Sequence, residues 1–392
     1  MAVDYVARSR ARSRRRETVD VASLAWRIDW ILVASVGALV GFGLWAISGI
    51  TRHDVAGNPD YYVVRQGAYV AVGVVGLLAA VLIDPDWYRR SWRLIFGGTL
   101  FVIAIVFAQG AVRGSKRWLD LGFFRFQPSE FGKVLVVLVL AGFLAERAKR
   151  LDEPGTTMRV VALASAPIFL VFLQPDVGTA MVYSAALAAV LFIAGTPWSH
   201  LAALGALVAL VASMILWVGP AGGVHVLKDY QAKRLTGFLH PQSDPGGATY
   251  NIVQSKNAIG AGQLNGRGVD GATQTTLHFL PEHHTDFVFA SLAEERGFVG
   301  ASILLGLYLL IVWRGLRIVA VARDAFSAIV AGGIVFGLLF QIFVNVGMTM
   351  GIAPITGIPA PFLSVGGSSM IANLVAVGIL LAIHIRARGV RR

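Results

Sequence analysis

Long apolar runs alternate with short polar segments along nearly the whole chain. The runs cover residues 28–50, 62–83, 94–112, 129–146, 158–174, 177–195, 199–219, 297–319, 325–350 and 367–386. A helix of about 17–25 mostly apolar residues crosses a hydrocarbon core of about 30 Å. Each crossing must be helical because lipid cannot satisfy open backbone groups. The pattern therefore predicts an all-α polytopic membrane protein with about ten transmembrane helices.

One long polar and glycine-rich segment, 220–285, interrupts this pattern. Within it, residues 224–240 carry an apolar stripe typical of a short amphipathic helix, and residues 249–259 predict a second short helix. The first helix also carries three basic residues, namely Lys228, Lys233 and Arg234. A basic amphipathic helix of this kind lies on a membrane surface. The glycines that follow predict an irregular loop, and their spacing matches no phosphate-binding fingerprint.

The composition agrees with a membrane protein. Hydrophobic residues make up 56% of the 392 residues and charged residues only 14%. Soluble globular proteins contain about 25% charged residues. The chain has no cysteine, which excludes disulfides and thiolate metal sites. The first apolar run lacks a small-residue cleavage signature, so we expect it to be a retained helix.

The net charge of +12 raises the question of nucleic-acid binding. The positions of the basic residues instead indicate that they set the orientation of the chain in the membrane. If the spans alternate from an inside N-terminus, one side receives Arg8, Arg10, Arg12, Arg14, Arg15, Arg16, Arg89, Arg90, Arg93, Arg147, Lys149, Arg150, Arg159, Arg314, Arg317, Arg323, Arg386, Arg388, Arg391 and Arg392. This is the positive-inside pattern, which predicts a multi-pass protein of the cell (cytoplasmic) membrane with both termini cytoplasmic and no nucleic-acid partner. Attraction of the N-terminal tail to anionic lipid is a compatible second role.

The resulting organisation has three parts. A cytoplasmic Arg-rich tail covers residues 1–27, and a single ten-helix membrane domain covers 28–386. The domain includes an extracytoplasmic loop at 220–296, and a cytoplasmic basic tail covers 387–392. Water-facing loops with placed polar groups usually carry function. We therefore expect the functional site on the outer face.

Asp286 is the first candidate for chemistry, because it closes the polar segment and opens an apolar helix. One interpretation is a helix N-cap whose charge suits the helix dipole. The other is a general base that accepts a proton from a bound hydroxyl. His283 and His284 do not predict a metal site, because adjacent side chains point in different directions and no H-E-x-x-H spacing exists.

Other charged residues lie at the ends of the predicted spans. Glu130 and Lys133 are three residues apart and share a helical face, either as a structural ion pair or as a cavity-lining pair. Asp176 either caps the sixth span or faces an interior cavity. Glu294 and Glu295 are expected in a solvated approach to the eighth span.

Two exterior loops leave further alternatives open. Loop 113–128 holds basic residues outside, which either pair and snorkel at the interface or bind an anionic headgroup. Ser368 and Ser369 are suited to cap the tenth span, and an anion site at that helix terminus is the alternative.

Six motifs in order resemble one known family. They are Arg-Trp-Leu-Asp-Leu-Gly at 117–122, Arg-Phe-Gln-Pro-Ser-Glu at 125–130 with Lys133, Gln-Pro-Asp-Val-Gly-Thr at 174–179, Tyr-Asn-Ile-Val-Gln-Ser-Lys at 250–256, His-Thr-Asp-Phe at 284–287 and Pro-Phe-Leu-Ser-Val-Gly-Gly-Ser-Ser at 361–369. From about residue 28 to the end, the chain resembles the SEDS family (shape, elongation, division, sporulation). The sequences at 117–122 and 279–282 (Phe-Leu-Pro-Glu) are more similar to the elongation branch of this family than to its division branch. Val365 stands where this family commonly has tyrosine.

The resemblance implies a peptidoglycan glycosyltransferase that polymerises lipid II during cell elongation and shape maintenance. In this interpretation Asp286 is the base, acting directly or while coordinating a divalent cation such as Mg or Mn, and no organic cofactor is expected. Glu130 and Lys133 match the family's cavity pair. Further candidates for the cavity or for pyrophosphate binding are Lys116, Arg117, Asp176, Lys228, Lys233, Arg234, Lys256, Ser368 and Ser369.

The resemblance also implies partners, namely a class B penicillin-binding protein with transpeptidase activity and other membrane proteins of the elongation machinery. Glycines in spans eight and nine suit close helix packing, and Gly333 in particular is expected in the partner interface. Two other functions stay open at this point. One is a flippase for the lipid-linked precursor, and the other is a scaffold without catalytic activity.

Overall fold

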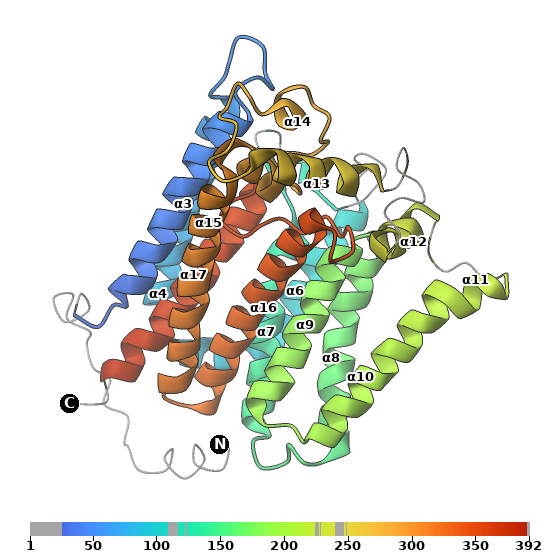
Figure 1. The fold of residues 1–392 in the computed structure, drawn as a ribbon. Helices are drawn as coiled ribbons and strands as arrows, with labels where there is room; N and C mark the ends of the chain where they lie inside the picture. Colours follow the sequence, from blue (N-terminus) through green and yellow to red (C-terminus); the bar gives the residue numbers. More distant parts are fainter. Residues whose placement is uncertain are drawn as a thin grey trace.

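The computed structural model describes residues 26–108, 117–120, 122, 124–223, 227, 229–239, 247 and 249–389. Its membrane-length helices are α3 (Trp30–Ile50), α4 (Tyr61–Leu82), α7 (Pro128–Glu146), α8 (Pro154–Leu173), α9 (Val177–Ala194), α10 (Trp198–Ser213, continued by the π-helix η2, Met214–Val218, and α11, Gly219–Ala221), α15 (Val288–Val321), α16 (Ala325–Met350) and α17 (Gly367–Gly389). Within the described residues these nine helices are long and apolar enough to cross a membrane. They confirm the all-α polytopic class and nine of the predicted spans (Figure 1).

The third predicted span, 94–112, is shorter in the structure. It corresponds to α6 (Trp92–Ala104) and a 3₁₀ turn, η1 (Ile105–Ala108), preceded by the short helix α5 (Pro85–Arg90). At 1.5 Å per residue in a helix, 17 residues would reach about 25 Å, slightly less than a hydrocarbon core. Residues 109–112 lie outside the described residues. The N-terminal tail up to residue 25 and the last three residues of the C-terminal tail also lie outside them.

The core of the bundle is formed by α7, α16 and α17. More than two thirds of the side chains are buried in the apolar windows of these helices, and 89% are buried in α17. In contrast, α10 has no buried residue, and Figure 1 shows it leaning away from the other helices. A helix that is apolar on all sides and lies at the periphery presents its side chains to lipid. The buried helices thus support the site, and α10 connects the exterior segment to the bundle.

The exterior segment folds into short helices over the end of the bundle. Its elements are α12 (Asp229–Thr236), the 3₁₀ turn η3 (Gly237–Leu239), α13 (Tyr250–Gly262) and α14 (Thr273–Thr276). These elements confirm short helices within the predicted ranges 224–240 and 249–259. Helix α13 packs against α15 and α16 and lies across their upper ends in Figure 1. The exterior segment is therefore docked on the membrane helices.

The prediction of a solvated approach to the eighth span is wrong. Helix α15 begins at Val288, and both Glu294 and Glu295 are buried. The Glu294 carboxylate accepts hydrogen bonds from the backbone nitrogens of Gln274 and Thr275, at 2.8 and 3.0 Å. It thereby satisfies the free N–H groups at the start of α14, a long-range contact that local sequence does not show.

Gly297 interrupts α15 and explains how the exterior loop approaches it. Its φ of 64° lies in a region that favours glycine. A Cβ at this position would lie 2.3 Å from the backbone nitrogen of Gly266. Glycine is therefore required here both by conformation and by close contact between two backbones.

The expected role of Gly333 in a partner interface is also wrong. A Cβ at Gly333 would lie 2.6 Å from Val137 of α7 and 3.0 Å from Val190 of α9. The glycine thus allows α16 to pack closely within the chain itself. A bulky residue would disturb the bundle before it affected any partner.

Candidate active site

A cavity of about 590 Å³ opens among the exterior ends of the helices. It is lined by residues from five parts of the chain: Arg117, Trp118, Arg125, Gln127, Glu130, Pro175, Asp176, Val177, Thr179, Gln231, Arg234, Leu235, Glu282, Thr285, Asp286, Ile355, Thr356, Gly357, Pro359, Val365, Gly366, Ser368 and Ser369. Most of the motifs that carried the family resemblance therefore meet in one place. Carboxylates and guanidinium groups share the lining, which suits a polar substrate with an anionic part.

Asp286 lines this cavity and does not cap the following helix. The N-cap of α15 is Phe287, with no side-chain capping bond. No other described residue forms a hydrogen bond or ion pair with the Asp286 carboxylate, whereas its backbone carbonyl accepts a bond from Asn345 Nδ2 at 2.9 Å. Burial and the nearby Glu282 raise the pKa of Asp286 to about 6, although Arg234 and Arg117 oppose this shift. A carboxylate with this pKa and no fixed donor is suited to accept a proton near neutral pH.

The segment that carries Asp286 is anchored to the first exterior loop. His283 Nε2 lies 3.0 Å from both carboxylate oxygens of Asp54, and His284 Nδ1 lies 3.5 Å from one of them. The three ligand atoms lie within 4.8 Å of one another, a spacing that a metal ion could bridge. The sequence argument considered the two histidines alone and did not identify Asp54, which is distant in the chain.

A second anchor comes from the loop before α17. Ser364 Oγ donates a hydrogen bond to the Thr285 carbonyl at 2.5 Å, and the backbone nitrogen of Val365 donates to the His284 carbonyl at 3.0 Å. Both donors belong to the 361–369 motif. The residues on each side of Asp286 are therefore held by other parts of the chain, while its carboxylate stays available.

Glu130 and Lys133 form a buried ion pair on one face of α7. The Lys133 ammonium lies 2.7 Å from Glu130 Oε2 and donates a second bond, also 2.7 Å long, to Gln341 Oε1 of α16. Glu130 lines the large cavity, whereas Lys133 lines a smaller one deeper in the bundle. The two interpretations of the sequence thus describe the same pair, which joins α7 to α16 directly beneath the cavity.

Three guanidinium groups line the cavity, from Arg117, Arg125 and Arg234. Arg117 is held by the carbonyl groups of Gln174 and Pro175, and Arg125 Nε lies 3.8 Å from Asp120 Oδ2 across a two-stranded hairpin. The hairpin pairs β1 (Leu119–Asp120) with β2 (Arg125–Phe126). Both interpretations of loop 113–128 therefore retain support, because its described cations are paired and also face the cavity.

Other predicted cations do not meet in the cavity. Lys233 and Lys256 are exposed and do not line it. Lys116 and Lys228 lie outside the described residues. Arg234 and Lys233 are neighbours in α12, but only Arg234 lines the cavity. The presence of a basic residue in the sequence did not indicate which side of the helix faces the cavity.

Asp176 both caps a helix and faces the cavity. Its Oδ1 accepts a bond from the Thr179 backbone nitrogen at 3.1 Å, and its Oδ2 accepts one from Gln127 Nε2 at 3.2 Å. Ser368 and Ser369 also line the cavity, but they lie in the first turn of α17, which begins at Gly367. Ser368 Oγ accepts a bond from the Gln127 backbone nitrogen at 2.9 Å and so fixes the start of α7.

Glu282 is a site residue that the sequence analysis did not select. It lines the cavity four residues before Asp286, and its Oε2 accepts a bond from Thr285 Oγ1 at 2.9 Å. Its place in the Phe-Leu-Pro-Glu motif at 279–282, which contributed to the family resemblance, could have identified it. Carboxylate oxygens are the ligands that a divalent cation such as Mg prefers. Mg usually binds one or two carboxylates together with substrate phosphates. Asp286 and Glu282 offer the type of ligand atom that such an ion prefers.

Comparisons with known proteins agree over most of the chain. The sequence profile FTSW_RODA_SPOVE, described as cell cycle protein, matches residues 26–389. The peptidoglycan glycosyltransferase MrdB of Escherichia coli (strain K12) is 39% identical over 349 residues, which are 88% of this chain and 92% of that protein. A solved chain from a study of polymerization and crosslinking by a peptidoglycan synthase complex has a TM-score of 0.77 at 29% identity, covering 92% of this chain and 98% of that one. The rod shape determining protein RodA of Thermus thermophilus has a TM-score of 0.67 at 27% identity, covering 91% and 96%.

Proposed function

The chain belongs to the family of FtsW, RodA and SpoVE cell cycle proteins, and we propose that its exterior cavity is where glycan strands are made. It is a multi-pass membrane protein and a peptidoglycan glycosyltransferase. The observation that carries the assignment of the site is the position of Asp286. Asp286 lines a cavity of about 590 Å³, no described residue donates a hydrogen bond to its carboxylate, and three arginines line the same cavity.

In the proposed reaction two lipid-linked sugars meet in this cavity. The growing glycan is the donor and lipid II is the acceptor. Asp286 takes the proton from the acceptor 4-hydroxyl, and the oxygen attacks the anomeric carbon of the donor sugar. The bond from that carbon to the lipid pyrophosphate breaks, and the pyrophosphate leaves with the electron pair. Proton removal by a positioned carboxylate contributes about 10²–10⁴-fold to the rate of such steps.

The departing pyrophosphate carries negative charge, and the lining offers fixed cations for it. Arg117, Arg125 and Arg234 are the described candidates. Guanidinium groups bind phosphate oxygens in a bidentate manner, and their charge is more effective in a site that excludes water. The lipid tails of both substrates also give a reason for placing the cavity at the membrane surface.

A divalent cation is part of the proposal, with Asp286 and Glu282 as its protein ligands. Such an ion, when bound, supplies positive charge that stabilises developing negative charge on phosphate and hydroxyl oxygens. The proton transfer itself is assigned to Asp286. Asp54, His283 and His284 have the separate role of holding the segment that carries it.

The pKa of Asp286 predicts the pH dependence of strand synthesis. The base must be deprotonated, and with a pKa of about 6 its ionised fraction increases as the pH rises. About a tenth is ionised at pH 5 and about nine tenths at pH 7. We expect the rate to rise about tenfold over this range when measured with purified lipid II and no added divalent cation, because a cation bound to Asp286 would lower its pKa. A flat profile, with folding verified at each pH, would contradict the role of Asp286 as the base.

Partnership and orientation are further parts of the proposal. The solved chain from the peptidoglycan synthase complex study supports a penicillin-binding protein as a partner, and we propose a class B transpeptidase. Such a partner would crosslink the strands that this enzyme makes. We also propose that both termini are cytoplasmic and that the cavity faces outward, because the basic residues follow the positive-inside pattern.

Single cysteines will test this orientation in a chain that has none of its own. Asn265 in the exterior segment and Asp152 before α8 are both exposed and lie at opposite ends of the bundle. In intact cells, Asn265→Cys is expected to react with a membrane-impermeant maleimide. Asp152→Cys should react only after the membrane has been permeabilised. The opposite labelling pattern would reverse the proposed orientation.

A further inference from the structure

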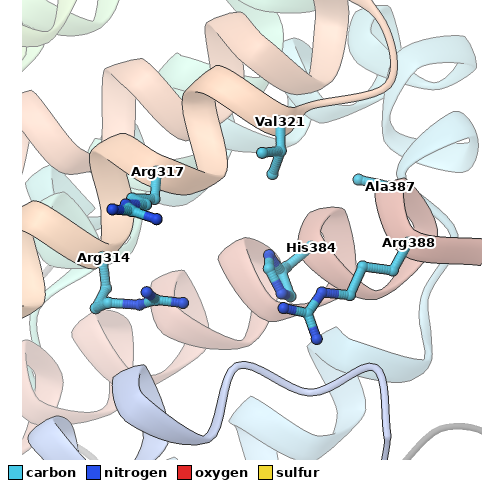
Figure 2. A pocket seen from close by; sticks show the side chains of 6 residues that line it. All are labelled: Arg314, Arg317, Val321, His384, Ala387 and Arg388. Carbon is cyan, nitrogen blue, oxygen red and sulfur yellow. The ribbon is translucent and has the colours of Figure 1, made fainter. Parts of the chain in front are cut away.

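A second pocket lies at the opposite end of the bundle from Asp286. It has a volume of about 140 Å³ and is lined by Arg314, Arg317, Val321, His384, Ala387 and Arg388. The first three residues belong to α15 and the others to α17 (Figure 2). The reaction proposed above uses none of these residues. The lining holds three guanidinium groups and an imidazole, with no carboxylate.

His384 is the residue in the pocket that most directly indicates a ligand. It is 4% exposed, and neither of its ring nitrogens has a hydrogen-bond partner among the described residues. Leaving a polar group buried without a partner costs about 1–3 kcal/mol. In the view of Figure 2, its ring lies between the guanidinium groups of Arg314 and Arg388. An acceptor group in the pocket would give the ring N–H its missing partner.

The arginines of the pocket are only partly neutralised. Arg314 is bound to the buried carboxylate of Asp29, with Nη2 at 2.6 Å and Nε at 3.1 Å from Oδ2. Arg317 stacks on Trp313, with 4.9 Å between the guanidinium carbon and the ring centroid. No described acidic residue forms an ion pair with Arg317 or Arg388. Within the part of the chain that the structure describes, two positive charges are therefore left for an anion.

The depth of the pocket places it at the level of lipid headgroups. His384 follows the exterior start of α17 at Gly367 by 17 residues, which correspond to about 26 Å along a helix. A hydrocarbon core is about 30 Å thick, so the ring lies near the far interface. Arg388 lies one turn further and is exposed. The pocket thus combines a buried donor with cations at the height where phosphate groups are found.

We propose that this pocket binds a phosphate group, supplied by the headgroup of an anionic phospholipid in the leaflet opposite the active site. The phosphate oxygens would accept hydrogen bonds from His384 and charge-assisted bonds from Arg317 and Arg388, as guanidinium groups favour. A soluble phosphate could offer the same chemistry from the aqueous side. The inference goes beyond the proposed function, because it concerns neither lipid II nor Asp286. Binding there would join α15, which begins beside the active site, to α17.

The test measures lipid binding by the full-length protein. Bound lipid is detected by native mass spectrometry after detergent exchange. The probes are phosphatidylglycerol, phosphatidylcholine and inorganic phosphate. The test variant is Arg317→Gln/Arg388→Gln. The control is Arg90→Gln/Arg159→Gln, which removes the same charge from exposed arginines at the same end but outside the pocket. We expect phosphatidylglycerol to bind the test variant at least about tenfold more weakly, equal to about 1.4 kcal/mol, and the control variant normally.

His384→Phe provides a second measurement, since it removes the ring N–H without changing the arginines. It should weaken phosphatidylglycerol binding while thermal unfolding without lipid stays close to that of the unchanged protein. Phosphatidylcholine should bind weakly throughout. Binding of inorganic phosphate that depends on Arg317 and Arg388, without binding of phosphatidylglycerol, would overturn the lipid source. Equal binding of all probes by all variants would overturn the site.

Discussion

Asp286→Asn is expected to lower strand synthesis by about two orders of magnitude or more, the usual scale of general-base catalysis. The amide has nearly the same size as the carboxylate, but it cannot accept the proton and is a weaker ligand for a cation. Folding should change little, because the Asp286 carboxylate neither caps α15 nor pairs with another described side chain. Burial raises the pKa of Asp286 to about 6, so the folded state disfavours its charge and should tolerate a neutral amide.

The measurement is polymerisation of purified lipid II, with thermal unfolding and partner binding determined on the same samples. Asp270→Asn is the matched control, because Asp270 is an exposed acid in the same exterior segment and does not line the cavity. It should polymerise at the normal rate. Asp286→Glu, which displaces the charge by about one bond, should retain partial activity at most. Normal synthesis by Asp286→Asn would reject the catalytic role and reopen the flippase and scaffold alternatives.

Joint replacement of Glu130 by Gln and Lys133 by Met is expected to give a folded protein with activity reduced on the order of 100-fold. Breaking a buried pair from one side costs about 3–5 kcal/mol, whereas removing both charges is often nearly neutral for stability. The double variant therefore separates folding from function. The loss of activity should follow from the altered position and charge of the Glu130 side chain in the cavity, and from the loss of the Lys133–Gln341 bond beneath it.

The matched control for this pair lies at the other end of α7. Arg93 and Glu146 form an ion pair with a distance of 3.0 Å between Nη2 and Oε2, far from the cavity. Arg93→Gln/Glu146→Gln should leave polymerisation unchanged. Lys133→Met alone should unfold at a lower temperature than the double variant, because it leaves Glu130 buried without its cation. Near-normal polymerisation by the double variant would restore a purely structural role for the pair.

The sequence predicted the parts of this protein that depend on local pattern. Apolar runs identified the membrane helices, because their lengths are set by the bilayer. The spacing of Glu130 and Lys133 predicted their pairing, since residues three apart on a helix are neighbours. Asp286 was selected because a carboxylate between a polar segment and an apolar helix is unusual. Its surroundings were outside the reach of this reasoning.

What local pattern could not show were contacts between distant segments. Asp54 meets His283 and His284 because two exterior loops converge, and nothing near Asp54 in the sequence indicates this. Glu294 is buried because α14 lies against α15 and needs its carboxylate, whereas its own neighbours suggested a solvated position. Gly333 was assigned to a partner because small residues favour close packing but do not identify what packs there.

The arrangement of the cavity has a consequence for the order in which the protein is made. One wall comes from residues 355–369, which follow almost all of the chain, and the anchors of Asp286 include Ser364 and Val365 from the same part. Synthesis proceeds from the N-terminus, and the earlier helices enter the membrane first. A growing chain therefore holds Asp286 before it holds the loop that packs against it. A chain that ends before this loop lacks part of the site, so we expect unfinished copies not to consume precursor.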